Sequence, residues 1–122
     1  DMKNFAEEFR DRTKKQAVEI IKYCKTLPKS DEAYIVKKQV IRSSTSVAAN
    51  YRAATRARSD NEFFSKLSIV VEEADETEFW LEIIRESEIK KKKKSLELLK
   101  ESGEILKIVS KSRKTLKDKK GV

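Results

Sequence analysis

The chain lacks histidine altogether, and it has only one cysteine, one proline and two glycines among its 122 residues. Without histidine it has neither the commonest general base nor the commonest nitrogen ligand for metal ions. Its single cysteine, Cys24, has no second cysteine for an internal disulfide and lies in an apolar pattern typical of a helix core. We therefore expect a protein that is not an enzyme and that holds no metal or cofactor.

One enzyme hypothesis is left, and it is the least favoured. Carboxylates cluster in the third predicted helix, at Glu72, Glu73, Asp75 and Glu76. Di-iron bundle proteins use such carboxylates together with Glu-x-x-His pairs, which a chain without histidine cannot form. A site built from carboxylates alone would suit Mg²⁺, but no spacing in the sequence supports one.

Proline and glycine are too scarce to supply many turns, so the sequence favours few and long elements. Charged residues make up 41% of the chain and aromatic residues 7%, and apolar residues recur at helical spacing, which predicts an all-α bundle in one domain. The expected helices span about residues 3–27, 31–57, 60–87 and 95–117. No targeting peptide and no membrane-spanning run is recognisable, so we expect a cytoplasmic protein without a membrane partner.

Three local signals set these boundaries. Pro28 is expected to end the first helix, because proline cannot continue a helical hydrogen-bond ladder. Ser59 followed by Glu62 fits a capping box at the start of the third helix. The lysine run from Lys90 to Lys94 is expected to link the third helix to the fourth.

Apolar spacing predicts which side of each helix faces the core. The third helix has a seam of three- and four-residue steps, and the expected bundle centre consists of Val47, Tyr51, Leu67, Val70, Ala74 and Leu81. In the fourth helix the expected inner face carries Leu96, Leu99, Gly103 and Leu106. Gly103 marks either a close helix crossing or a tolerated surface position.

The third helix also has a second apolar line on its back, at Ile69, Phe79, Trp80 and Ile83. A helix with two apolar faces needs two partners, and the second is either another helix of this chain or another subunit. We predict an oligomer interface formed by Ile69, Glu72, Glu76, Trp80 and Ile83.

The second helix has an unusual composition. It carries four consecutive hydroxyl residues, Ser43 to Ser46, which usually compete with helical hydrogen bonding. Because small hydroxyl side chains can bond back to carbonyls one turn earlier, we interpret them as a packing device. Asn50 on the same flank is either a buried group that fixes register or an exposed residue.

The polar face of the second helix is purely basic, because no acidic residue occurs between Ala33 and Ser59 in a chain of net charge +8. Two interpretations stay open: acidic residues of the third helix neutralise this face, within or between subunits, or the face binds phosphates of RNA or DNA. Neutralisation is favoured for Arg42, and phosphate binding for the arginines at the helix end. The candidate nucleic-acid-binding residues are Lys38, Arg42, Arg52, Arg56 and Arg58.

The stretch from Lys37 to Ile84 resembles a four-helix-bundle family whose founding members are encoded in intervening sequences of large-subunit ribosomal RNA genes. The matching features are the "RARS" turn, the "EADETEFWLE" run of the third helix, and Gln39, Val40, Arg42, Ser46 and Asn50 in the second. Many members have Glu-Gly where this chain has Ala53 and Ala54, so we expect its second helix to continue further before the turn.

The resemblance implies a left-handed, up-down-up-down bundle that forms homo-oligomers, with a pentamer as the expected form. A similar protein, the accessory variability determinant of diversity-generating retroelements, forms a basic pentameric barrel that binds nucleic acid and a reverse transcriptase. The resemblance therefore implies RNA or DNA as a partner, and a protein such as a reverse transcriptase as another. The alternative hypothesis is a structural or protein-partner adaptor whose charges serve subunit pairing.

Overall fold

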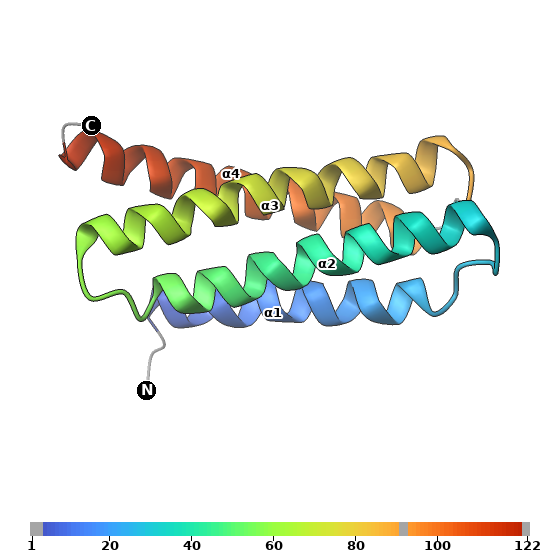
Figure 1. Ribbon diagram of the computed structural model, residues 1–122, viewed down its shortest axis with the longest axis horizontal. Coiled ribbons are helices and arrows are strands. Elements are labelled where there is room, and N and C mark those ends of the chain that lie inside the picture. Colours follow the sequence, from blue (N-terminus) through green and yellow to red (C-terminus); the bar gives the residue numbers. More distant parts are fainter. Residues whose placement is uncertain (1–3, 91–92, 121–122) are drawn as a thin grey trace.

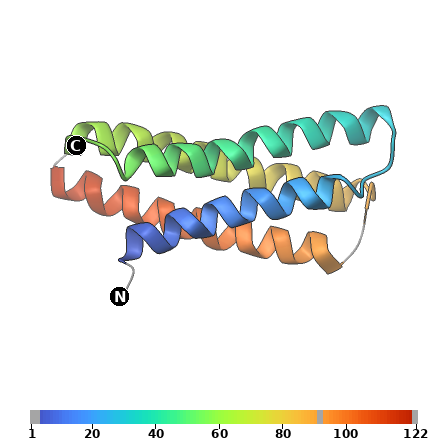
Figure 2. The same ribbon diagram turned by 90° about the horizontal axis from the view of Figure 1, so that it is seen from below.

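The computed structural model describes residues 4–90 and 93–120, apart from the side chain of Lys120. In these ranges the chain is all-α, as the sequence predicts, with no strand and with four helices: α1 (Phe5–Cys24), α2 (Asp31–Ala54), α3 (Asp60–Glu86) and α4 (Lys93–Lys120). The helices lie side by side along one long axis, with the α1–α2 connection at one end and the α2–α3 connection at the other (Figure 1). Both α1 and α3 contact α2 and α4, and Figure 2 shows α1 lying between α2 and α4.

Three helices begin with a side chain that caps a free backbone N–H group. Asn4 accepts a hydrogen bond from the N–H of Glu7 at 2.8 Å, and Ser30 accepts one from Ala33 at 3.2 Å. Ser59 accepts one from the N–H of Glu62 at 3.1 Å, which confirms the predicted cap of α3.

Both α1 and α2 end about one turn earlier than predicted. The N–H groups of Thr26 and Leu27 bond three residues back, to Tyr23 and Cys24, so the last turn tightens before Pro28. The end of α2 tightens in the same way, since Ala57 bonds back to Ala54. The expectation that α2 continues to residue 57 is wrong, because Ser59 must take an extended conformation, with φ −153°, to cap α3.

The predicted bundle centre is confirmed, because each of its six side chains is at most 5% exposed. The core forms two apolar clusters, one around Ile20 and Leu81 and the other around Phe9 and Leu67. On every helix a polar residue lies between the two clusters. These residues include Thr13, Gln16, Ser44, Thr77 and Ser102, which line a small cavity of about 10 Å³.

The predicted inner face of α4 is wrong in register. Leu96 is 38% exposed, and the buried positions are Ser95, Leu98, Ser102, Ile105, Val109 and Leu116. Serines can occupy this face because their hydroxyls find partners: the Gln16 amide donates to Ser102 Oγ at 3.0 Å, and Arg85 donates to Ser95 Oγ at 2.8 Å. Gly103 lies near α3, where a methyl group in its place would come within 3.0 Å of a Glu78 carboxylate oxygen.

Of the expected link between α3 and α4, Lys91 and Lys92 lie outside the described residues, whereas Lys93 and Lys94 already belong to α4.

Candidate nucleic-acid interface

Lys38 and Arg52 lie on the outward side of α2, and Arg56 follows in the turn after it; all three side chains are exposed. Their own helix offers no carboxylate at the i+3 or i+4 position, because α2 has no acidic residue after Glu32. Within the described part of the chain, none of the three forms an ion pair. Their charges are therefore open to an external anion.

Arg42 has different surroundings. Its guanidinium donates to Glu73 at 2.7 Å and 3.4 Å, and it also donates to Glu76, both on α3. These hydrogen bonds, first that to Glu73 and then that to Glu76, raise the pKa of Arg42. At this position the structure thus agrees with neutralisation by the third helix of the same chain.

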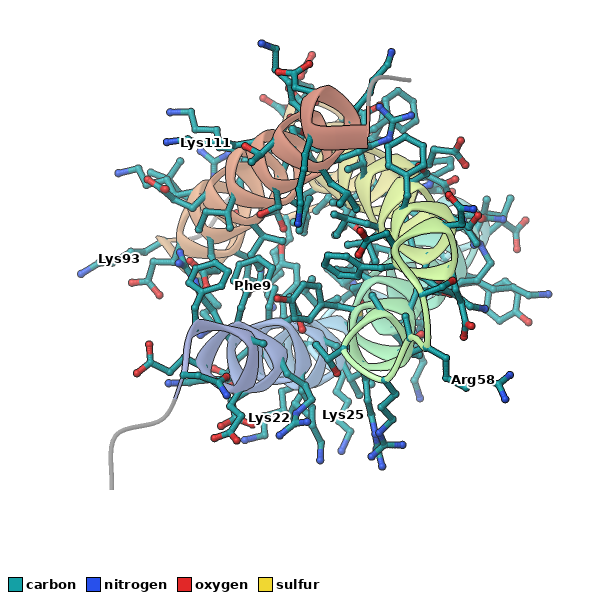
Figure 3. The ribbon with its side chains drawn as sticks, turned by 90° about the vertical axis from the view of Figure 1, so that its left-hand side faces the viewer. Phe9, Lys22, Lys25, Arg58, Lys93 and Lys111 are labelled. Atoms are coloured by element: carbon teal, nitrogen blue, oxygen red, sulfur yellow. The ribbon has the colours of Figure 1, made fainter. Side chains whose placement is uncertain are left out.

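Arg58 lies in the α2–α3 connection and points away from the bundle (Figure 3). Its side chain is 91% exposed, and its nearest carboxylate is that of Glu62, at 3.9 Å. An exposed pair of this kind is worth little, about 0–1 kcal/mol, so it leaves the guanidinium free to bind another anion.

The structure adds two cations that the sequence analysis did not single out. Arg10 and Lys14 on α1 lie across from Arg52, and together the three border a groove of about 250 Å³ between α1 and α2. We call this the α1/α2 groove. A helical wheel of the first helix would have shown the signal, since Arg10 and Lys14 are one turn apart on one side. Lys22 and Lys25 also project outward on this side of the bundle (Figure 3).

The predicted oligomer-interface residues of α3 fall into two groups. Ile69 and Glu72 are exposed, as is the neighbouring Phe79, whose side chain is 49% exposed. Glu76, Trp80 and Ile83 are half-buried and contact their own chain: Trp80 and Ile83 pack against the core, and Glu76 accepts a hydrogen bond from Arg42. The Trp80 indole donates to Glu76 at 3.2 Å, and the Trp80 ring meets that of Phe79 edge to face.

The hydroxyl cluster of α2 contributes to packing. Ser43 and Ser44 are buried, and each bonds to a carbonyl three residues earlier. Ser43 also forms a hydrogen bond of 2.9 Å with Thr77 of α3. Asn50 is half-buried and donates to the carbonyl and hydroxyl of Ser46, on its own helix.

Two features bear on catalysis. Burial raises the pKa of the Cys24 thiol to about 11, which makes this side chain a poor nucleophile. Across residues 4–90 and 93–120, no three His, Cys, Asp or Glu side chains form a group that could hold a metal ion.

In the same ranges, no helix has the length and apolar character needed to span a membrane.

The fold and this surface define a class: an all-α protein of four long helices, with a groove between α1 and α2 bordered by three cations that form no ion pair among the described residues. The chain belongs to the 23S rRNA-intervening sequence protein family, whose profile matches residues 7–111. It is similar to a crystallised protein of unknown function from the S23 ribosomal protein family of Bacteroides thetaiotaomicron, with 34% identity and a TM-score of 0.79. That match covers 87% of this chain and 98% of the other. No curated protein matches this chain.

Proposed function

We propose that this protein binds RNA or DNA without catalysing a reaction, and that it does so as a homo-oligomer. The proposed oligomer is a pentamer, and each subunit is a left-handed up-down-up-down bundle, as the resemblance to the family implies. The observation that carries the proposal is the set of exposed cations Lys38, Arg52, Arg56 and Arg58, which have at most one weak ion pair among the described residues. Arg42 is left out of this set, because Glu73 and Glu76 already neutralise it.

Such a surface would contact phosphates rather than base edges. Each neutralised phosphate releases condensed counterions, so binding should weaken steeply as salt rises. Contacts from lysine and arginine to phosphates carry no sequence information, so we expect little sequence preference. Repeating the surface around an oligomer would add weak contacts by avidity.

Assembly is supported by the outer side of α3. Ile69 and Phe79 are 38% and 49% exposed on this side, and burying them against a second copy would remove apolar surface from water. Carboxylates lie beside them, so charged pairs across a subunit boundary are part of the proposal.

The test is a titration of labelled RNA and duplex DNA at several salt concentrations with the variant Lys38→Ala/Arg56→Ala/Arg58→Ala. We expect weaker binding to all sequences alike, and a salt dependence flatter by about 1 in log–log slope for each lost phosphate contact. The matched control is Lys100→Ala/Lys107→Ala/Lys111→Ala, which removes the same charge from exposed positions of α4.

Absence of binding by the wild type even at low salt would refute the proposal and favour the structural or protein-partner adaptor. A control variant that loses as much affinity as the test variant would also refute the assigned surface, because net charge alone would then explain binding.

A further inference from the structure

The α1/α2 groove has an apolar floor and a cationic rim. The floor is made of small or branched side chains, including Ala17, Val18 and Ala49. Val18 is 41% exposed, so a partner docked there would remove apolar surface from water. At about 250 Å³ the groove is smaller than most sites for drug-sized ligands, which measure about 300–1,000 Å³, and is better suited to a few protein side chains.

The rim of the groove carries Arg10, Lys14 and Arg52, and none of them forms an ion pair within the described part of the chain. No acidic residue lines the groove. An occupant that fits must therefore present apolar side chains to the floor and negative charges to the rim.

The outer side of α3 has this chemistry. Glu72, Phe79 and Glu86 are exposed and follow one another at seven-residue spacing, so they share one face, with Ile69 one turn before Glu72. We call these four residues the α3 outer stripe. Neither Glu72 nor Glu86 has an ion pair among the described residues. The stripe and the groove thus carry opposite and uncompensated charges around exposed apolar side chains.

We propose that the α1/α2 groove is the docking site for the α3 outer stripe of a second copy of this chain. The contact is head-to-tail: each copy offers its stripe to one neighbour and its groove to another, which builds a closed ring when the rotation closes. A stripe that met only another stripe would bring like charges together, which costs free energy, whereas the groove supplies the opposite charge.

This inference rests on the proposed assembly into homo-oligomers but not on nucleic-acid binding. Lys38, Arg56 and Arg58 do not line the groove, so they stay open to phosphates in the assembled protein. Arg52 borders the groove, so in the assembled protein it would face the neighbouring copy and leave the phosphate surface to Lys38, Arg56 and Arg58.

The test measures mass in solution by light scattering for two variants. The groove variant Val18→Glu/Ala49→Glu places negative charges where the stripe would dock. The stripe variant Ile69→Lys/Phe79→Lys places positive charges on the stripe, where they would meet the cations of the groove. All four positions are exposed, so folding should persist, and circular dichroism checks it. The single change Ala49→Glu is the milder groove variant, at a helix position where glutamate is well tolerated. The control Ile35→Glu/Leu96→Glu alters exposed apolar residues outside both surfaces.

We expect the wild type and the control to have several times the chain mass, and each variant alone to have the mass of one chain. An equal mixture of the two variants should exceed the mass of one chain, because the intact stripe of the groove variant can dock in the intact groove of the stripe variant. A groove variant that assembles like the wild type, a mixture that stays at one chain mass, or a monomeric wild type would each overturn the inference. Salt-dependent RNA binding by a monomeric wild type would show that the phosphate surface stands without this interface.

Discussion

Arg42 and Arg52 are ten residues apart on α2, yet one is neutralised and the other is not. The difference comes from the adjoining helix: Arg42 is turned toward α3, which places Glu73 and Glu76 within reach, whereas Arg52 is turned toward α1, which offers Arg10 and Lys14. At the residue scale, then, the adjoining helix decides whether an arginine of α2 forms an ion pair within the chain or stays available to an external anion.

Leu67 is fully buried in the lower-numbered half of α3, in contact with the cluster around Phe9. We expect Leu67→Ala to lower the free energy of unfolding by about 2–5 kcal/mol, because the lost side chain leaves a cavity in a close-packed core. Urea unfolding at constant protein concentration measures this. Ile35→Ala, at an exposed aliphatic position outside both proposed docking surfaces, is the control and should change stability little. A midpoint for Leu67→Ala equal to that of the control would contradict the assignment.

At the scale of helices, a polar layer decides how α1 and α4 fit together. Gln16 is buried, and its amide donates to the carbonyl of Leu98 at 2.8 Å and to Ser102 at 3.0 Å. Next to it, Arg12 forms a two-bond pair with Glu101, with both N–O distances 2.7 Å. These contacts hold α4 in the register that buries Ser95 and Ser102 instead of Leu96.

We expect Gln16→Ala to cost about 1–3 kcal/mol, because it removes two hydrogen bonds and leaves the buried Ser102 hydroxyl without its donor. The matched control is Gln39→Ala, since Gln39 is partly exposed and only accepts a long hydrogen bond from Arg42. Equilibrium unfolding in urea compares the two variants. Equal effects would show that the layer does not hold the helices in register.

At the scale of the whole molecule, the two apolar clusters lie on opposite sides of the polar layer. Each cluster contains side chains from all four helices. If any one helix separated from the bundle, part of both clusters would be exposed to water. We therefore expect the described bundle to unfold as one cooperative unit.

Cys24 provides a probe of that unfolding, because it is 1% exposed and lies in the cluster around Ile20. Burial disfavours the thiolate and raises the pKa of Cys24 to about 11, so the reactive form is scarce in the folded protein until the pH approaches that value. At pH 8 we expect thiol labelling to be slow without denaturant and to accelerate along the urea unfolding curve measured by circular dichroism. A Cys24→Ala/Ser87→Cys variant, with its thiol at an exposed position, should label at once in native buffer. Fast labelling of the wild type below the unfolding transition would instead indicate local opening of α1.

The amino-acid sequence by itself determined the features that depend on local spacing. Helical periodicity placed Leu67, Val70 and Leu81 in the core, and Ser59 before Glu62 set the start of α3. The absence of acidic residues along α2 predicted a basic face, and Lys38 and Arg52 are indeed exposed there. These predictions succeed because a side chain's direction on a helix follows from its position in the repeat.

Only the tertiary structure decided the features that depend on a partner from another helix. In α4 two apolar lines compete, and the burial of Ser95 and Ser102 became acceptable only because Arg85 and Gln16 supply hydrogen bonds. The groove between α1 and α2 likewise arises because Arg10 and Arg52, 42 positions apart in the sequence, come to border one surface. Spacing along one helix fixes which way a side chain points, but hydrogen bonds and charges are satisfied across helices, so the packed bundle alone sets which polar groups are buried and which cations stay unpaired.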